Sequence, residues 1–453
     1  MKSRAKIPVD IADLRATALR SIDSVSRDII NAAKTVYSTP ETGFNEHRTS
    51  VFVQKKLEGL GFKVETGIAR TGMKALLKGG KSGPTVAVIA ESDSLRLPSH
   101  PGADSETGAA HACGHHTQVG SLLGVAAALS VPEIKASLAG NVVFVITPAE
   151  EFIEIENRLA LRESGELEFL SGKQEMIRLG TFDDIDMAMM VHSSAGSGNA
   201  IFSVGGTSNA HVSHQVRYLG RSAHAGGAPD KGVNALQAAM LANEAINTQR
   251  ETFKESDVVR VHGIISSGGD AVNAVPDEVL YEGRVRAKSV EAIKPIAERI
   301  VRCYRAGALA MGASVEVRSI AGYHPLKQNA IMQKLFASNA KLILGRDSVS
   351  VLDDDQTHGG STDMGDLSTI MPVIHPYANA AAGTGHGIDY IIEDYDRGVV
   401  SPAKVMTATL LSLLADGSQG AKKVLDLHRP SMTTEQYVET QRQRFTVETY
   451  DPS

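Results

Sequence analysis

The stretch Asn141-Val-Val-Phe-Val-Ile-Thr-Pro-Ala-Glu-Glu151 contains the pattern that decides the fold. It joins a short apolar run to a proline and two adjacent carboxylates. Such a run predicts a strand that is buried on both faces, as in a parallel sheet. Adjacent carboxylates usually lie on a solvated surface. At the end of a buried strand, however, two charges need a metal ion or another partner to offset their desolvation.

Polar side chains follow other apolar runs in the same way. Because active sites of open α/β sheets gather at the carboxyl ends of strands, we expect these side chains to converge, and we predict the α/β class. The runs and the candidates that follow them are Thr85 to Ala90 with Glu91 and Asp93, Asp186 to Val191 with His192, and Ile370 to Ile374 with the stretch from His375 to His386.

A second signal is the cluster His111-Ala-Cys-Gly-His-His-Thr-Gln118, which precedes an apolar helical run from Val119 to Leu129. Thiolate and neutral imidazole are the ligands that borderline divalent metals prefer, and Gly114 lets the backbone turn between them. A buried cysteine acting as a small apolar residue, with histidines satisfied by carbonyls, is the alternative. The spacing of Cys113 and His115 together favours a metal site.

The remaining candidates extend this site. Of Glu150 and Glu151, one would bind metal and the other would take a proton from water at the same point. Asp93 either orients a metal-bound imidazole or caps a helix or turn. His192 ends a core-type strand, and His386 lies between glycines that let backbone approach a ligand. Weaker candidates are His358 and His375.

Composition excludes several classes of partner. The chain has 453 residues, which predicts two or three domains, and a net charge of −6 without a basic block. We therefore expect no nucleic acid and no membrane partner, but a small molecule. Only Cys113 and Cys303 occur, so a disulfide framework is not expected and a reducing, cytoplasmic location is. No signal peptide and no apolar run of about 18 residues is apparent.

The texture changes between residues 210 and 321 to strand, helix, strand, strand, helix, strand. This order predicts a ferredoxin-like unit inserted into the α/β domain. We thus expect catalytic-domain segments at 1–209 and 322–453 and an inserted domain at 210–321. The polar tail from Lys423 is expected to be a peripheral or partner-contacting extension. The predicted elements are Val212 to Leu219, Asn234 to Ile246, Val258 to Ile265, Glu278 to Ala287, Val290 to Met311 and Ser314 to Ile320.

An ordered set of motifs covers most of the chain. The chain resembles the M20 metallopeptidase and amidohydrolase family, nearest to its aminoacylase-like branch and the p-aminobenzoyl-glutamate hydrolase group. The motifs are Pro40-Glu-Thr-Gly-Phe-Asn-Glu46, Glu91-Ser-Asp93, His111-Ala-Cys-Gly-His115, Pro148-Ala-Glu-Glu151, His192, Gly220-Arg-Ser-Ala-His224, Gly360-Ser-Thr-Asp-Met-Gly365 and His386.

The resemblance implies a catalytic domain with a mixed, mostly parallel sheet and an inserted lid and dimerisation domain. It implies a metal pair bridged by Cys113, with Glu150 as general base. It also implies that His224 approaches the reacting carbonyl or a substrate carboxylate and that Asn273 contacts a carboxylate; a capping or interface histidine and a turn residue are the alternatives. The other implied metal ligands are His115, Glu151, His192 and His386.

Two departures from the family pattern stand out. Close relatives carry Gly-His-Asp-x-His where this chain reads Gly-His-His-Thr-Gln, so His116 and Gln118 replace an acidic residue and an imidazole. This puts the second metal in question, and His116 either binds metal itself or caps the next helix. The segment from Phe152 to Gly180 is longer than in relatives and predicts an extra amphipathic helix from Ile155. We expect a surface embellishment; a reshaped pocket mouth or an oligomer contact are the alternatives.

The leading hypothesis is hydrolysis of an amide C–N bond in a small carboxylate-bearing substrate, such as an N-acyl or N-aroyl amino acid. One or two zinc or manganese ions per chain would acidify water for Glu150, and a metal with His224 would stabilise the oxyanion. A second hypothesis is hydrolytic deamination of an amino-substituted aromatic acid, and a third is a non-catalytic metal-dependent binding protein. We also expect a homodimer or larger homo-oligomer.

Overall fold

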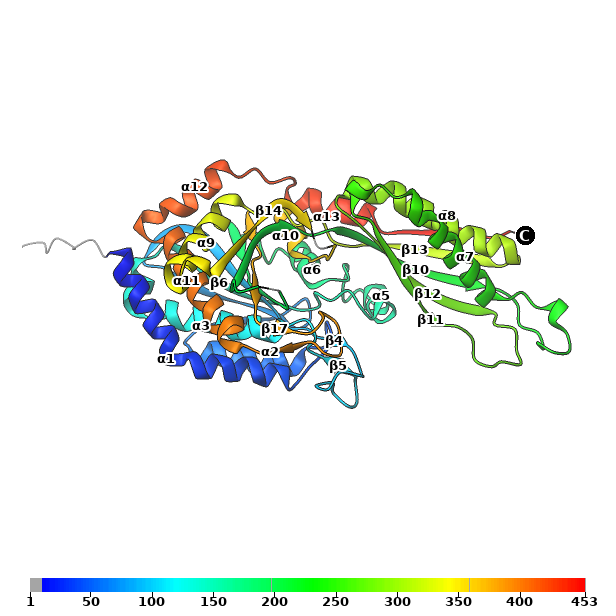
Figure 1. Ribbon diagram of the computed structural model, residues 1–453, viewed down its shortest axis with the longest axis horizontal. Helices are drawn as coiled ribbons and strands as arrows, with labels where there is room; N and C mark the ends of the chain where they lie inside the picture. Colours follow the sequence, from blue (N-terminus) through cyan, green and yellow to red (C-terminus); the bar gives the residue numbers. More distant parts are fainter. Residues whose placement is uncertain (1–9, 197, 358, 453) are drawn as a thin grey trace, which may run out of the picture. The chain divides into compact units, whose positions relative to one another are not determined.

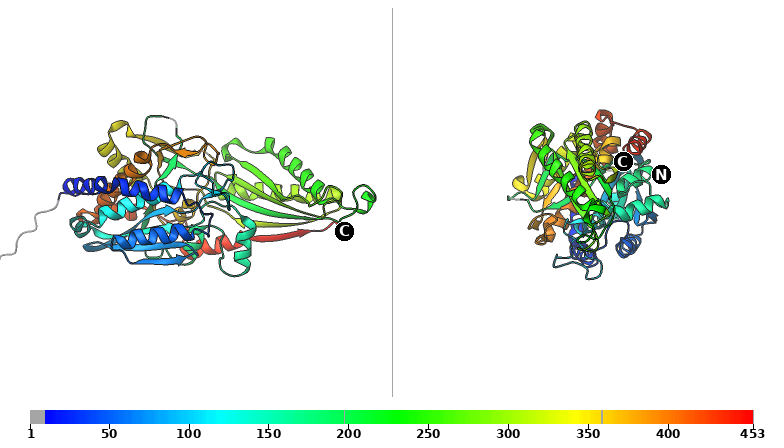
Figure 2. Two further views of the ribbon diagram at one scale, coloured as in Figure 1. Left: turned by 90° about the horizontal axis from the view of Figure 1, so that it is seen from below. Right: turned by 90° about the vertical axis from the view of Figure 1, so that its right-hand side faces the viewer.

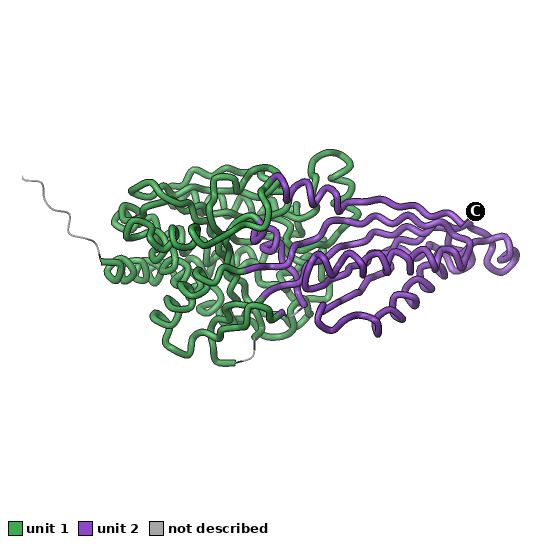
Figure 3. The backbone as a smooth tube through the Cα atoms, turned by 90° about the horizontal axis from the view of Figure 1, so that it is seen from above, with its two compact units in different colours: residues 1–206, 328–356, 370–434 green, residues 207–327, 357–369, 435–453 purple. Residues whose placement is uncertain are grey.

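The computed structural model describes residues 10–196, 198–357 and 359–452. The chain divides into two compact units, which Figure 3 colours separately. Unit 1 contains the segments that end at residue 206 and the segments 328–356 and 370–434. Unit 2 contains residues 207–327, 357–369 and the segment from 435 onward. The predicted domain boundaries, at 209 and 321, remain predictions about separate folding units.

Within the described part of unit 1, the main sheet has six strands in the order β1-β2-β6-β3-β7-β15. Neighbouring pairs from β6 to β15 are parallel, and β1 and β2 are added in antiparallel fashion. This confirms the mixed, mostly parallel sheet, and the apolar runs quoted above supply its parallel strands. The bounds are β1 (Val64–Ile68), β2 (Gly72–Lys78), β3 (Lys81–Glu91), β6 (Ala139–Thr147), β7 (Met187–Met189) and β15 (Val373–Ile374).

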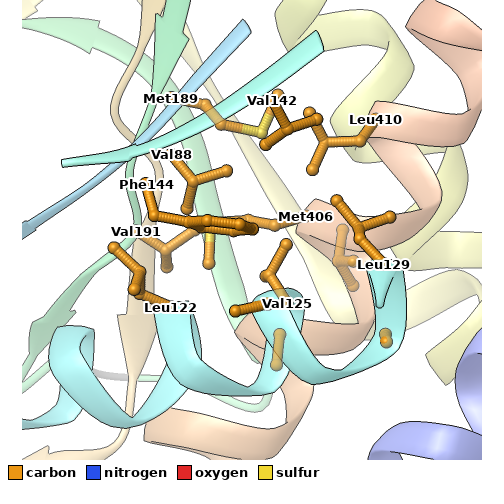
Figure 4. Packing of buried hydrophobic residues seen from close by; sticks show 14 of the residues in the cluster. Val88, Leu122, Val125, Leu129, Val142, Phe144, Met189, Val191, Met406 and Leu410 are labelled. Carbon is orange, nitrogen blue, oxygen red and sulfur yellow. The ribbon is translucent and has the colours of Figure 1, made fainter. Parts of the chain in front are cut away.

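Three long helices pack together beside this sheet: α1 (Ile11–Tyr37), α3 (His115–Leu129) and α11 (Ser401–Leu414). Helix α3 is buried nearly all round because it lies between the sheet and the other two helices. Figure 4 shows Leu122 and Val125 of α3 against Phe144 of the sheet and Met406 of α11. The other helices of unit 1 are α2 (His47–Gly59), α4 (Pro132–Ser137), α5 (Ile155–Glu163), α6 (Gly172–Arg178), α9 (Ala330–Leu344) and α12 (Gln419–Leu427).

Shorter strands surround the edge of the sheet where the parallel strands end. A further sheet has the order β14-β9-β16-β8, and the pairs β4-β5 and β17-β18 complete the strand content that the described residues show. The bounds are β4 (Leu95–Arg96), β5 (Ala109–Ala110), β8 (His192–Ser194), β9 (Phe202–Thr207), β14 (Val349–Thr357), β16 (Tyr377–Asn379), β17 (Ala381–Ala382) and β18 (Ile391–Ile392).

Unit 2 contains an antiparallel sheet in the order β11-β12-β10-β13-β19, with α7 and α8 on one face (Figures 1 and 2). Buried residues alternate with partly exposed ones along β12, as expected for a sheet covered on one face. The first four strands in this order and both helices confirm the ferredoxin-like prediction. The bounds are β10 (Ala210–Leu219), α7 (Ala235–Gln249), β11 (Arg260–Ser267), β12 (Glu278–Ala287), α8 (Val290–Met311) and β13 (Ser314–Ala321).

The C-terminal tail is part of the unit 2 sheet. Helix α13 (Thr434–Gln443) buries Tyr437 completely, and its hydroxyl donates a hydrogen bond of 2.8 Å to Asp366, in α10 (Met364–Ile370). Strand β19 (Thr446–Tyr450) then pairs with β13. The expectation of a peripheral extension is therefore wrong for this segment, because strand pairing and a buried polar contact hold it in the unit.

No single helix among the described residues is long and apolar enough to cross a membrane. By length and composition alone, the bent pair Asp396–Leu414 and Asp416–Leu427 passes that test. Most residues of α11, which belongs to this pair, are buried inside unit 1.

Candidate metal centre

The ends of the parallel strands in unit 1 bring the predicted side chains together. Strand β3 ends at Glu91, and its neighbour β6 leads into the loop with Glu150 and Glu151. Asp93 connects these two strand ends, because its Oδ2 accepts a hydrogen bond of 2.8 Å from the Glu151 backbone. The residue before Glu150, Ala149, has a left-handed backbone with φ of +50°, a strained conformation that is often found at functional loops.

Cys113, His115 and His192 form the first ligand group, in which one side-chain ligand atom from each lies within 4.8 Å of the others. The Cys113 Sγ is 3.4 Å from the His192 Nε2. Gly114, with φ of +98°, makes the turn between Cys113 and His115, and a Cβ there would lie 2.8 Å from the Tyr390 hydroxyl oxygen. Glycine is therefore required at the point where the sequence predicted a turn.

Hydrogen bonds orient both imidazoles of this group. The Nδ1 of His115 lies 2.9 Å from the Asp93 carbonyl oxygen and 3.1 Å from its Oδ1, and the Nδ1 of His192 lies 2.7 Å from the Ser193 carbonyl oxygen. An imidazole that donates from Nδ1 presents Nε2 as its ligand atom. Both rings therefore direct Nε2 toward the centre, and Asp93 occupies the orienting position that the sequence suggested for it.

Cys113, Glu151 and His386 form the second group within the same distance limit. The Nε2 of His386 lies 3.1 Å from the Glu151 Oε1. His386 has φ of +64°, uncommon for a residue other than glycine, and its side chain is 54% exposed. Cys113 belongs to both groups, so the structure brings all five predicted ligands together around one sulfur atom.

A third group consists of Glu91, His115 and Glu150. The Glu91 Oε2 lies 3.2 Å from the His115 Nε2, and a Glu150 carboxylate oxygen lies 4.0 Å from the same nitrogen. Gln118 holds Glu91 at two points: its amide donates to Oε2 over 2.8 Å, and its Oε1 accepts from the Glu91 backbone over 3.0 Å. The amide of Gln118 thus supports a carboxylate beside the first group.

The segment 152–180 also reaches this centre. Lys173 of α6 is 0% exposed, and its Nζ lies 2.5 Å from the Glu91 Oε1. Arg158 of α5 is 1% exposed and donates a hydrogen bond of 2.7 Å to the Leu170 carbonyl. The predicted helix at Ile155 is confirmed, but the expected surface embellishment is wrong, because the segment packs inward and delivers a buried ammonium to the centre.

The clustered charges shift the pKa values strongly. Burial and the Glu151 carboxylate would raise the pKa of Cys113, but the imidazoles of His192 and His115 outweigh them and lower it to about 6. The Glu151 carboxylate raises the pKa of His386 to about 11. Burial would raise the pKa of Glu91, but Lys173 and His115 hold it well below its usual range. A thiolate and ionised carboxylates therefore surround one point near neutral pH.

This donor set fits a divalent cation. Thiolate sulfur, imidazole nitrogen and carboxylate oxygen are the atoms that zinc and related metals bind in proteins. Two groups that share one cysteine could hold two cations with that sulfur between them. The anions that raise the imidazole pKa values would also stabilise cationic charge placed among them.

Residues 86–412 match the sequence model of Peptidase family M20/M25/M40. The chain belongs to this family. It is therefore a metal-binding hydrolase of the M20 family that acts on C–N bonds, the class to which peptide and amide bonds belong. The resemblance inferred from the motifs is confirmed, as is the expected fold class. The non-catalytic alternative loses its support.

Known M20 proteins match most of the chain. An Xaa-Arg dipeptidase from Mus musculus is 29% identical over 80% of this chain and 79% of its own. A p-aminobenzoyl-glutamate hydrolase chain from Escherichia coli (strain K12) is 27% identical over 87% of this chain and 91% of its own. A Bacillus subtilis structure described as a dinuclear metal-binding M20 peptidase has the same fold, with a TM-score of 0.61, 20% identity and coverage of 86% and 99%.

The M20 resemblance also pointed to His224 and Asn273, both of which lie in unit 2. They are exposed and adjacent there, since the Ala225 backbone donates to the Asn273 carbonyl over 2.9 Å. The His224 Nδ1 accepts from the backbones of Gly226 and Gly227 at 3.1 and 3.0 Å. Their predicted roles at the substrate remain predictions.

Weaker candidates of the M20 chain have other surroundings. His116 is 0% exposed, packs against the rings of Tyr37 and His111 and lies 3.3 Å from the Tyr395 hydroxyl; it belongs to none of the ligand groups that the described residues form. His375 is buried, with its ring centroid 5.7 Å from that of His192, and burial lowers its pKa to about 3. His358 lies outside the described residues.

Sequence reasoning missed Lys173 and underrated Glu91. Glu91 was visible as the residue that ends a buried strand, but it was not assigned a role. Lys173 gave no local signal, because a single lysine in a polar segment is usually solvated. Only the packing of α6 against the strand ends reveals it.

Proposed function

We propose that the protein hydrolyses the amide C–N bond of a small carboxylate-bearing substrate, such as an N-acyl or N-aroyl amino acid. One observation carries the proposal: two ligand groups share Cys113, and the Glu150 carboxylate lies 4.0 Å from the His115 Nε2 of the first group. The names of two relatives support the substrate class, because Xaa-Arg dipeptides and p-aminobenzoyl-glutamate both carry an amide bond next to an amino acid carboxylate.

The proposed roles follow from the chemistry of the side chains. One or two divalent cations, zinc or manganese, would be held by Cys113, His115, Glu151, His192 and His386. When bound, such a cation supplies Lewis acidity, which acidifies water and polarises a carbonyl oxygen. Glu150 accepts the proton of the attacking water and returns it to the leaving nitrogen, because an ionised carboxylate within reach of the same point can act in both directions.

Unit 2 supplies the proposed substrate contacts. His224 would donate from Nε2 to the developing oxyanion, since its Nδ1 already accepts two backbone hydrogen bonds. Asn273, beside it, would bind the substrate carboxylate through its amide. We further propose that the protein acts in the cytoplasm as a homodimer or larger homo-oligomer; a reducing compartment suits the reactive thiol of Cys113.

Hydrolytic deamination of an amino-substituted aromatic acid is the second candidate. It is favoured by the inward packing of segment 152–180, which places the Lys173 ammonium 2.5 Å from Glu91. This buried cation, with Gln118 and His116 at positions where the family resemblance implies other residues, alters the polarity beside the first ligand group. A changed leaving group is one consequence that such a change could have.

The test is a product assay on protein loaded separately with Mn²⁺ and Zn²⁺. N-acyl amino acids, p-aminobenzoyl-glutamate and aminobenzoates are supplied in parallel, and free amino acid and ammonia are measured, with Glu150→Gln protein as the background. Release of amino acid from the amides supports the proposal. Release of ammonia from aminobenzoates with intact amides overturns it in favour of deamination.

A further inference from the structure

Lys173 and Glu91 form a fully buried ion pair beside the first ligand group. Both residues are 0% exposed, and the Nζ to Oε1 distance is 2.5 Å. Burying an ion pair costs desolvation that its attraction rarely exceeds, so such pairs are a poor way to stabilise a fold. The position of this pair therefore calls for a reason other than stability.

The two carboxylate oxygens of Glu91 have different neighbours. Oε1 faces Lys173, whereas Oε2 lies 3.2 Å from the His115 Nε2, the ring nitrogen that does not face Asp93. Gln118 fixes the carboxylate from the other side through two hydrogen bonds. Glu91 is thereby held with one oxygen on the ammonium and the other toward the point that His115 and Glu150 also face.

The chain positions Lys173 through the start of α6. The Gly172 backbone donates to the Ala149 carbonyl over 3.2 Å, and a Cβ on Gly172 would lie 1.8 Å from the Pro148 carbonyl oxygen. Glycine is needed for this close approach. The helix that carries Lys173 is therefore fixed to the loop that carries Glu150 and Glu151.

We propose that Glu91 is a further oxygen ligand for the cation at His115, and that Lys173 is an internal counter-cation that competes with it for the Glu91 charge. The inference rests on the metal centre of the proposed function. Lys173 is thus a positioning residue: it keeps Glu91 ionised and oriented, and it limits how tightly the centre holds a divalent cation.

The experiment measures Mn²⁺ affinity of the full-length apo-protein from the electron paramagnetic resonance signal of free Mn²⁺. Lys173→Met should bind Mn²⁺ at least about tenfold more tightly, because a repelling charge within a few ångströms is removed. Glu91→Gln should bind it at least about tenfold more weakly, because a ligand charge is lost. Lys173→Arg keeps the charge and should stay within about threefold of wild type.

Arg178→Met is the matched control. Arg178 lies on the same helix and pairs with Glu175 and Glu168 rather than with Glu91, so its loss should leave Mn²⁺ affinity within about twofold. Should Lys173→Met fail to fold, the double variant Glu91→Gln/Lys173→Met removes the pair without leaving a buried charge and should still bind Mn²⁺ more weakly than Lys173→Arg.

Unchanged Mn²⁺ affinity in Glu91→Gln, or unchanged or weaker affinity in Lys173→Met, overturns the inference. A purely structural pair would destabilise apo- and metal-loaded protein equally and leave affinity alone. Amide hydrolysis together with unchanged affinities would reject only this inference. The predicted affinity shifts without any amide hydrolysis would reject only the proposed function.

Discussion

Ionisable side chains lie on the sheets of both units, but only those of unit 1 are withdrawn from water together. At the strand ends of unit 1, Glu91, Asp93, His115 and Lys173 are all fully buried. On the unit 2 sheet, Arg217 and Glu278 form an ion pair in which both side chains are 47% exposed. Buried charges depend on one another or on a cation, whereas exposed ones are satisfied by water. Substitutions in the two units should therefore differ in kind as well as in size.

The largest expected effect is on catalysis in unit 1. Glu150→Gln should lower turnover by roughly two to four orders of magnitude while bound metal stays unchanged, because the amide cannot accept a proton. Turnover and metal content are measured on the same preparation. Glu278→Gln on the exposed pair of unit 2 is the control and should retain turnover. Near wild-type turnover in Glu150→Gln would refute the assigned base.

A core substitution in unit 2 should affect stability without affecting the metal centre. Ile300 of α8 is 0% exposed, so Ile300→Ala should cost about 2–5 kcal/mol of unfolding free energy. Leu309 on the same helix is 60% exposed, and Leu309→Ala should change it by less than about 0.5 kcal/mol. Urea unfolding followed by circular dichroism measures both. Equal losses in the two variants would contradict the packing described for unit 2.

Acid should destabilise unit 2 through a buried neutral histidine. Burial lowers the pKa of His214 from 6.5 to about 4, so the unfolded chain takes up a proton first as the pH falls. Its contribution is present above pH 6.5 and lost toward pH 4, by about 3 kcal/mol. In His214→Gln, the stability difference between pH 7.5 and 4.5 should shrink by about this amount. An unchanged difference would show that other groups dominate.

The smallest effect is expected at the exposed ion pair. Arg217→Ala should lower stability by only about 0–1 kcal/mol, because both partners remain hydrated in the variant. The same unfolding assay measures it, with added salt as a second condition. A loss of several kcal/mol would mean that exposure does not separate the two kinds of charge.

Much of the fold could be predicted because strands and ligands carry local signals. The apolar runs before Glu91 and Glu150 mark parallel strands, and the strand and helix order from 210 to 321 identifies the unit 2 sheet. The five predicted ligands converge because parallel strands end at one edge of a sheet. Their spacing along the chain contributes little to that convergence.

The missing parts depend on contacts between distant segments. Strand β19 is short, polar and mostly exposed, so no hydrophobic pattern announces its pairing with β13. The burial of Lys173 depends on the close approach of Gly172 to Pro148, which no periodicity reveals. Buried charge at the centre is thus a property of the tertiary structure, whereas the ligand types are visible in the sequence.

X-ray absorption at the metal edge of Zn²⁺-loaded protein tests the central claim most directly, because Cys113 alone supplies sulfur to both ligand groups. We predict a sulfur scatterer at about 2.3 Å together with nitrogen or oxygen at about 2.0–2.1 Å. The sulfur contribution should disappear in Cys113→Ser. A shell of light atoms alone in the wild-type protein, unchanged in that variant, would contradict the account.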